Sequence, residues 1–232
     1  MCTLILAWQV FDDVPVVAAA NRDEHLDRPS LPPDVVGTDP RIVAPRDERA
    51  GGTWIGYNEH GVFAAITNRR APVEGLRSRG LLVLDALDHP TAREAARQLE
   101  REVDRRSYDG FNLVVADAAT ATLFEWDGSL RTTDFEPGVH VVVNTGADGA
   151  AAKATRVRDA LWVEPGESAG EWLDRAERAL RDHDLGTCVH TDGYGTRSSS
   201  LIELDASGNA GYRFADGPPC ESTYREHGDG QI

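Results

Sequence analysis

The cysteine at position 2, directly after the initiator methionine, is the residue with the clearest chemical potential. A small second residue permits removal of Met1, which would leave Cys2 with a thiol of pKa about 8.5 and an α-amine of pKa about 7.7 to 8.0. Such an amine can act as the base for its own nucleophile. From its position alone, a buried cysteine that opens a strand is the plainer interpretation.

Polar side chains gather at the points where predicted strands end. Side-chain amides can stabilise a developing oxyanion, and a carboxylate with an arginine can orient the amine of a nucleophile. Taken singly, each is also typical of a turn or a cap. Residues of this kind at or beside strand ends are Asn21, Arg22, Asp23, Asn68, Asn144 and Arg197.

The elements that would position these residues alternate between groups of strands and pairs of helices. Apolar patterns predict strands over residues 3–10, 14–20, 53–57, 62–67, 111–117, 121–127, 140–143, 187–191, 199–204 and 210–214. Helical spacing predicts helices over 79–87, 91–105, 150–162 and 168–183, the last opened by a capping box of Ser168 and Glu171. The proline-rich stretch 28–39 predicts an irregular surface segment, and the tail from 217 a loose end. This order favours antiparallel sheets covered by helices, a layered α+β fold.

The composition describes an acidic protein of 232 residues, with 39 Asp and Glu against 24 Lys and Arg and a formal net charge of −15. This charge excludes a generic nucleic-acid binder, because affinity for phosphate backbones comes mainly from basic residues. Lys153 is the only lysine. An acidic, lysine-poor chain predicts a halophilic protein, whereas a GC-rich genome would explain the scarcity of lysine but not the charge. The length predicts a single domain over residues 1–232.

No apolar run reaches the roughly 18 residues of a membrane helix, and no secretory signal is evident, which predicts a cytoplasmic protein. The three cysteines form no Cys-x-x-Cys pair, which argues against a disulfide scaffold. Cys188 and His190 would share one strand face, but two such ligands do not make a zinc site, and helix capping suffices to explain His183. We therefore predict no metal and no cofactor, and a small molecule as the partner.

Seven motifs, in order from Cys2 to about residue 200, resemble the NRDE family, also called the transport and Golgi organisation 2 family. The resemblance implies an N-terminal-nucleophile (Ntn) hydrolase-like fold, a four-layer αββα sandwich of two antiparallel sheets. The motifs are Met1-Cys2-Thr3, Asn21-Arg22-Asp23-Glu24 with Arg28-Pro29, Ala50-Gly51-Gly52-Thr53-Trp54, Thr67-Asn68, Ser78-Arg79-Gly80, Gly110-Phe111-Asn112-Leu113 and Tyr194-Gly195-Thr196-Arg197-Ser198-Ser199.

A more distant likeness to choloylglycine hydrolases and acid ceramidase-type amidases implies a role for each catalytic candidate. Cys2 would be the nucleophile with its own amine as base, and Asp23 would hold that amine. Asn68 and Asn144 would form the oxyanion pocket, and Arg197 would be a positioning cation. The implied activity is hydrolysis of a linear amide or thioester.

Two departures from the pattern bear on these roles. Those amidases show Arg-Asn-x-Asp at the end of the second strand, whereas this chain has Ala20-Asn21-Arg22-Asp23. In a strand, a shift of two positions keeps the arginine on the same face, one pleat further along. Where the family has serine before the last asparagine, this chain has Val143.

The alternative is a carrier that uses the same pocket without chemistry, for haem or for acyl-coenzyme A and lipids. The chain lacks the Cys-x-x-Cys-His motif that would favour haem. The arginines suited to phosphate contacts are also ordinary surface residues. Trp54 would line the pocket or pack in the core. Gly51 and Gly52 would form a turn or allow a ligand to approach closely. The binding candidates are Asn21, Arg22, Arg28, Trp54, Arg69, Arg79 and Tyr194.

Overall fold

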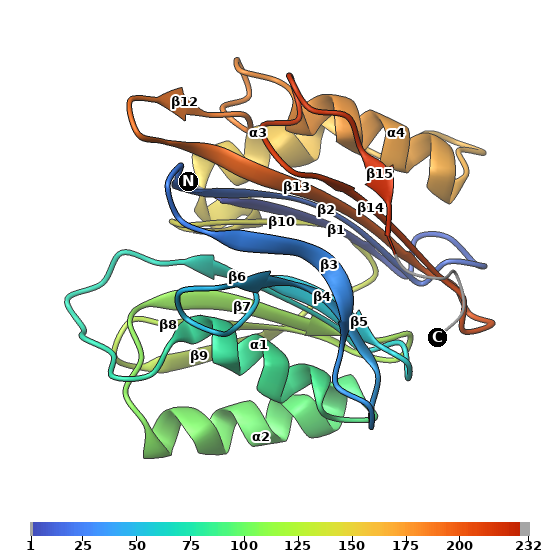
Figure 1. Ribbon diagram of the computed structural model, residues 1–232. Helices are drawn as coiled ribbons and strands as arrows, with labels where there is room; N and C mark the ends of the chain where they lie inside the picture. The colour runs from blue at the N-terminus through green and yellow to red at the C-terminus, as the bar shows by residue number, and fades with distance from the viewer. Residues whose placement is uncertain (1, 228–232) are drawn as a thin grey trace.

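The computed structural model describes residues 2–227 as two antiparallel sheets that lie face to face. A pair of helices covers the outer side of each sheet, so that the molecule has four layers (Figure 1). This arrangement confirms the predicted α+β sandwich. Among residues 2–227, no helix is long and apolar enough to cross a membrane.

The first sheet contains the strand that begins directly after Cys2 and the strand that contains Asp23 near its end. Its strand order is β11-β10-β1-β2-β13-β14-β15, and β12 pairs with β13. Helices α3 (Ala152–Ala160) and α4 (Ala169–Leu180) cover it. Its strands are β1 (Thr3–Trp8), β2 (Val16–His25), β10 (Gly138–Val143), β11 (Gly146–Ala147), β12 (His190–Thr191), β13 (Tyr194–Leu204), β14 (Ala210–Ala215) and β15 (Arg225–Glu226).

The second sheet has its strands in chain order, from β3 to β9. Helices α1 (Arg79–Leu87) and α2 (Ala92–Arg105) cover its outer face. Its strands are β3 (Ser30–Val36), β4 (Ile42–Asp47), β5 (Ile55–Asn58), β6 (Phe63–Asn68), β7 (Phe111–Ala116), β8 (Ala121–Trp126) and β9 (Leu130–Asp134).

Strand alternation divides the core and decides which side chains face the space between the sheets. In β1, Leu4 and Leu6 pack between the two sheets, whereas Ile5 packs under α3 and α4. In β2, Ala18 lies between the sheets and Ala19 under the helices. Even-numbered residues of β1 and β2 therefore face the second sheet, and odd-numbered residues face the helices.

All four predicted helices form, with ends shifted by up to three residues, and the capping box of Ser168 and Glu171 is present. The prediction of an irregular segment over 28–39 was wrong, because residues 30–36 form the edge strand β3. Its two prolines lie where the register shifts between Leu31 and Asp34. An edge strand at a bulge tolerates proline, since the missing N–H is not needed by a second neighbour.

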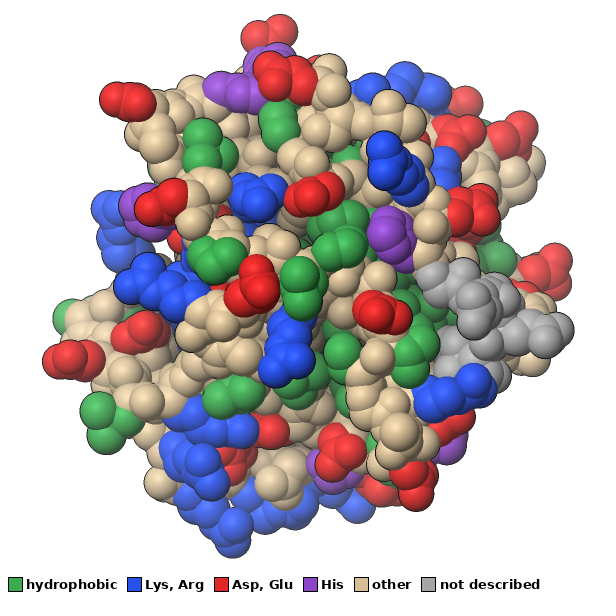
Figure 2. All heavy atoms as spheres, viewed as in Figure 1, with side chains coloured by type: hydrophobic (Ala, Val, Ile, Leu, Met, Phe, Trp, Pro, Cys, Tyr) green, Lys and Arg blue, Asp and Glu red, His purple; other side chains and the backbone are tan. Residues whose placement is uncertain are grey.

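Residues 217–227 hold more regular structure than their glycine and prolines indicate. Within residues 217–227, β15 pairs with β14, and Pro218 accepts two backbone hydrogen bonds that close a turn. On the face seen in Figure 2, acidic and basic side chains are interspersed.

Candidate active site

Cys2 lies at the entrance of β1, beside the end of β2. Its thiol donates a hydrogen bond to the main-chain carbonyl of Asp23 at 3.7 Å, and the Tyr194 hydroxyl donates to the same carbonyl at 3.1 Å. Burial and the negative charge of Asp23 raise the pKa of the Cys2 thiol, although Arg22 opposes this effect. The thiol is therefore held in its protonated form unless a base is present.

The Asp23 carboxyl group is buried on the helix side of the sheet. Its Oδ1 accepts a hydrogen bond of 2.7 Å from Oγ1 of Thr196, the residue opposite it on β13. Burial raises the pKa of Asp23, while the Thr196 hydrogen bond and the positive charge of Lys153 work against that rise. A buried carboxylate of this kind favours a cation next to it, such as the α-ammonium of a processed Cys2.

Lys153 does not line the pocket but interacts electrostatically with Asp23 and Cys2, a placement that sequence reasoning did not find. It lies in the first turn of α3, half-buried, and burial lowers its pKa while the charges of Asp23 and Cys2 raise it. No motif or periodicity points to this position. The available signal was its uniqueness, because every other basic residue of the chain is an arginine.

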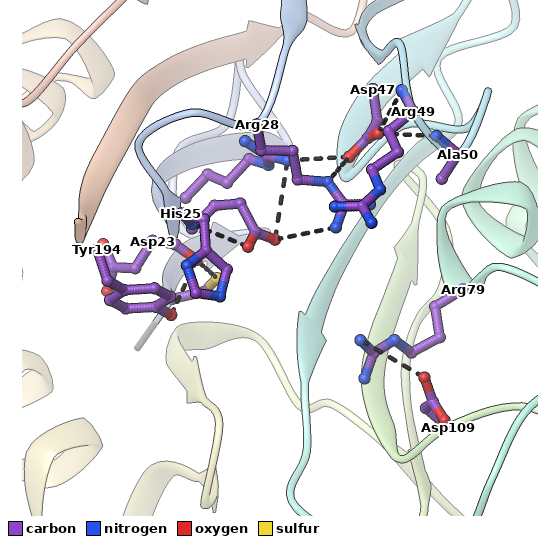
Figure 3. Close-up of polar contacts among 12 residues, drawn as sticks. Asp23, His25, Arg28, Asp47, Arg49, Ala50, Arg79, Asp109 and Tyr194 are labelled. Atoms are coloured by element: carbon purple, nitrogen blue, oxygen red, sulfur yellow. Dashed lines mark hydrogen bonds and ion pairs between the residues drawn. The ribbon is translucent and has the colours of Figure 1, made fainter.

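Two arginines of the NRDE stretch share one carboxylate that sequence reasoning also missed. Arg28 Nε lies 2.7 Å from Oδ2 of Asp47 (Figure 3), and Arg22 Nη2 lies 3.0 Å from the same oxygen. The carboxylate of Glu24 lies 3.9 Å from Arg22 and 3.8 Å from Arg28. The Arg22 guanidinium also stacks over Trp54 at 4.3 Å from the ring centroid. As predicted, Arg22 shares the face of Ala20, between the sheets.

Asp47 organises the turn that follows it as well as the arginines. Its Oδ1 accepts hydrogen bonds from the backbone N–H groups of Arg49 and Ala50 at 3.1 and 2.9 Å (Figure 3). Burial alone would raise the pKa of Asp47, but the hydrogen bonds from Arg28 and Ala50 and the charges of both arginines lower it overall. Asp47 therefore stays ionised and fixes Arg22 and Arg28.

The glycine pair after Asp47 places the turn against the start of α1. Gly51 has a φ of +73°, and a Cβ on Gly52 would lie 2.3 Å from the carbonyl carbon of Gly80. The backbone of Thr53 donates to Gly80 O at 3.0 Å. The glycines thus provide both a left-handed turn and a close backbone approach.

Arg79 enters the pocket from this junction. Its Nη1 donates to the carbonyl of Gly110 at 2.8 Å, and its Nη2 lies 4.0 Å from the Asp109 carboxylate (Figure 3). Burial lowers the pKa of Arg79, while the charges of Asp109, Cys2 and Glu24 raise it. Arg79 therefore presents a weakly paired cation beside the thiol.

These residues line a pocket between the two sheets, with about 90 Å³ of space that water-sized groups can enter. That volume is well below the roughly 300 Å³ of a pocket that encloses a drug-sized ligand. The pocket can accept a reacting group, but the rest of a larger molecule must remain outside. Its lining comprises Cys2, Arg22, Asp23, Glu24, Arg28, Asp47, Ala50, Gly52, Thr53, Trp54, Ile66, Asn68, Ser78, Arg79 and Gly80.

Three of the predicted site residues have contacts elsewhere. Asn21 faces α4, where its Nδ2 donates to the carbonyls of Leu180 and Thr187, both at 2.8 Å. Arg69 pairs with Glu125 at 2.7 Å. Arg197 pairs with Asp216 at 3.0 Å. None of the three lines the pocket described above, so for these residues the structure favours roles in holding the fold together.

The two predicted oxyanion residues meet, but through the backbone of one of them. Asn144 Nδ2 donates to the main-chain carbonyl of Asn68 at 2.6 Å, and Asn68 lines the pocket. A side-chain amide has a second N–H, which Asn144 can still offer. Of the predicted set, the residues brought together at the pocket are therefore Cys2, Arg22, Asp23, Arg28, Trp54, Asn68 and Arg79, with Tyr194 and Asn144 bonded to members of this group.

The family model described as "Transport and Golgi organisation 2" matches residues 1–168. A mouse homolog of transport and Golgi organization 2 is 34% identical, and a human homolog is 28% identical. Each alignment covers 86% of this chain and 88% of the relative. The chain belongs to the transport and Golgi organisation 2 family.

The solved structures that this family member resembles are Ntn hydrolases. Penicillin V acylase from Agrobacterium tumefaciens superposes with a TM-score of 0.60 at 14% identity, over 100% of this chain and 99% of that one. An N-acylethanolamine-hydrolyzing acid amidase ortholog from Caenorhabditis elegans gives 0.58 at 11% identity, over 87% and 92%. The C2A mutant of conjugated bile acid hydrolase from Clostridium perfringens gives 0.55 at 9% identity, over 98% and 97%. At these identities the likeness shows the shared fold.

Proposed function

We propose that this protein is a cysteine Ntn-type hydrolase that cleaves a linear amide or thioester through Cys2 after removal of Met1. The observation that carries the proposal is the position of the Cys2 thiol in a pocket between the sheets, bonded to the backbone of the buried Asp23. The fold neighbours support it, because their names describe an acylase, an amidase and a bile acid hydrolase. Met1 itself lies outside the described residues.

The proposed reaction proceeds in two steps. In the first, the free α-amine of Cys2 takes the thiol proton, and the thiolate attacks the substrate carbonyl to form a tetrahedral oxyanion. The carbon–nitrogen or carbon–sulfur bond then breaks, and the α-ammonium returns its proton to the leaving amine or thiol. In the second step, water attacks the acyl-cysteine thioester with the amine as base, which releases a carboxylic acid and restores the thiol.

The surrounding side chains have distinct proposed roles. Asp23 holds the α-ammonium, since a buried carboxylate stabilises a neighbouring cation. The amide groups of Asn68 and Asn144 donate to the oxyanion. Arg22 and Arg79 orient an anionic part of the substrate at the pocket rim. For Arg197, which pairs with Asp216, we propose an indirect role through the bulge it occupies in β13.

Incubation with amide and thioester substrates, followed by intact-mass analysis, tests the proposal. We expect protein from its source organism to lack Met1 and to gain the mass of an acyl group, and we expect Cys2→Ala to gain none. Cys2→Ser serves as a second control, because it keeps the size of the side chain but weakens the nucleophile. A retained Met1 would sink the proposal, because the α-nitrogen of Cys2 would then be an amide without basic character.

A specific observation favours a second candidate, a carrier for acyl-coenzyme A, lipid or haem. Arg22, Arg28 and Arg79 line the pocket, and arginine is suited to binding phosphate groups such as those of coenzyme A. Titration with acyl-coenzyme A and with haem distinguishes the two functions. Equal binding of these ligands by wild type and Cys2→Ala, with no hydrolysis of any amide or thioester, would favour the carrier.

We also propose that the protein works in a salt-rich cytoplasm. The net charge of −15 and the single lysine support this location, because a dense carboxylate surface stays hydrated and is screened at high ionic strength.

A further inference from the structure

Two cysteines and two histidines outside the pocket gather where the loop after α4, the start of β12 and the C-terminal segment meet. They are His183, Cys188, His190 and Cys220, and one ligand atom from each lies within 4.8 Å of the others. Cys188 is buried, Cys220 is half-buried and both histidines are exposed. The cluster is therefore held by the fold and reachable from solvent.

Three separations within the cluster are close to those of ligands around a tetrahedral metal ion. Cys188 Sγ lies 3.4 Å from Cys220 Sγ and 3.5 Å from His190 Nε2, and His190 Nε2 lies 3.1 Å from Cys220 Sγ. Zinc bonds of about 2.3 Å to sulfur and about 2.0 Å to nitrogen, at tetrahedral angles, place ligand atoms about 3.3 to 3.8 Å apart. The rings of His183 and His190 lie 5.2 Å apart between centroids.

The backbone on each side holds these ligands in position. The N–H of Cys188 donates to Asp182 O at 3.3 Å, and Gly186 closes a turn on the carbonyl of His183 at 3.0 Å. Cys220 lies in the turn in which residues 221 and 222 donate to Pro218 O. Ligands placed by hydrogen-bonded turns lose little freedom on binding an ion, which favours a specific site.

We propose that His183, Cys188, His190 and Cys220 bind one Zn²⁺ in a closed, structural site. Binding releases two protons, because both cysteines coordinate as thiolates and both histidines as neutral imidazoles. Two thiolates balance the charge of the ion. Two sulfur and two nitrogen ligands in a tetrahedron select zinc over the hard cations, which prefer oxygen. In sequence, only Cys188 and His190 are close enough to share a strand face, and the fold adds His183 and Cys220 to make four ligands.

The site would clamp the C-terminal segment to the hairpin that supports the candidate active site. The N–H of Val189, between two of the ligands, donates to Thr196 Oγ1 at 2.9 Å, and that hydroxyl donates to Asp23 at 2.7 Å. Asn21 holds Thr187, one residue before Cys188. Zinc therefore stabilises the loop on which the position of the Asp23 carboxyl group depends.

The test is the metal content of reduced protein. The full chain, prepared with a thiol-free reductant and excess zinc and then freed of unbound metal, should retain one zinc per chain. Cobalt in place of zinc should give the visible absorption of tetrahedral thiolate coordination. Cys188→Ser, Cys220→Ser and His183→Ala should lose both signals, and a chelator should lower the Tm of the wild type by about 5 °C or more.

Two control variants separate this site from the rest of the chain. Cys2→Ser removes the third cysteine, and His60→Ala removes an exposed histidine far along the chain, and both should retain one zinc. Retention in Cys2→Ser keeps the test independent of any hydrolase activity. The proposal would be overturned if reduced wild type kept no zinc, if the ligand variants bound as wild type does, or if anaerobically purified protein contained a disulfide between Cys188 and Cys220.

Discussion

Replacement of Asp47 by asparagine should destabilise the protein far more than the same change at an exposed aspartate. Asp47 is 8% exposed, and among residues 2–227 its carboxylate is the closest acidic partner of Arg22, which is 6% exposed. In Asp47→Asn, Arg22 would keep Glu24 at 3.9 Å as its acidic neighbour. Removing one member of a buried ion pair costs about 3 to 5 kcal/mol.

The asparagine retains one carbonyl oxygen, which can still accept one of the original hydrogen bonds. We therefore expect a loss of about 2 to 4 kcal/mol, less than for complete removal. For a chain of this length, about 2 to 4 °C in Tm corresponds to each kcal/mol, so the Tm should fall by roughly 5 to 15 °C. Thermal unfolding followed by circular dichroism measures this shift.

Asp174→Asn is the matched control, because Asp174 is 59% exposed and pairs with Arg213 at 3.5 Å. An exposed pair contributes about 0 to 1 kcal/mol and is screened by salt, whereas a buried pair is screened much less. The difference between the two variants should therefore persist in molar salt. Equal Tm values for Asp47→Asn and Asp174→Asn would refute the assignment of Asp47 as the fixed centre of the arginine cluster.

The same variant has a defined pH dependence. The native pKa of Asp47 is lowered, so its contribution to stability is present above its unfolded value of about 4 and is lost as the pH falls through the native pKa. Asparagine does not titrate in this pH range, so the variant lacks this contribution at every pH. The gap in unfolding free energy between wild type and variant should narrow below about pH 4, and a constant gap would contradict the pKa direction.

Three further outcomes are expected. Lys153→Met should raise the midpoint pH of Cys2 alkylation by iodoacetamide by up to about one unit, whereas Lys153→Arg should leave that midpoint near the wild-type value. Equal alkylation profiles for both variants and wild type would contradict a role for the charge of Lys153. Gly52→Ala should lower the free energy of unfolding by several kcal/mol, because its Cβ would collide with the backbone of Gly80. Gly61→Ala, at a φ of +77° with open space around it, should lower the free energy of unfolding by about 1 kcal/mol, and urea unfolding measures both changes. Tm should rise from millimolar to molar salt as carboxylate repulsion is screened, and an unchanged Tm would argue against a halophilic protein.

The elements that sequence predicted well are those in which local patterning and tertiary environment agree. Residues 79–87 have apolar side chains at helical spacing, and α1 covers that range. The alternation of Ala18, Ala19 and Ala20 shows in β2 as burial against different layers. The same alternation, continued over the next two residues of β2, places Asn21 towards the helices and Arg22 towards the pocket. The motif makes Asn21 and Arg22 neighbours in sequence, whereas strand alternation puts them on opposite faces of β2.

The residues that sequence reasoning missed depend on pairing between distant strands. Asp47 follows the proline-rich segment, and its role arises because β4 returns beside β3 and brings its carboxylate to Arg22 and Arg28. Arg197 lies in the bulge where the register of β13 against β2 shifts between Thr196 and Ser198. A bulge redirects side chains and cannot be located from one strand alone.

Lys153 shows how an acidic background can make one cation informative. Of 24 basic residues, 23 are arginines, and the remaining lysine lies beside Asp23 and Cys2. The two cations differ at a half-buried position: arginine stays charged and needs space for a planar guanidinium, whereas a lysine amine responds to burial and to neighbouring charges. At Lys153, burial lowers the pKa and the two acidic groups raise it. In the hydrolysis proposed above, Cys2 changes between thiol and thiolate, and a lysine amine can respond to that change through its protonation, whereas a permanent cation cannot. For this reason Lys153→Arg should preserve the alkylation profile yet slow acyl transfer, which Lys153→Met should abolish or slow further. An acyl-transfer rate unaffected by Lys153→Arg would show that the charge alone matters at this position.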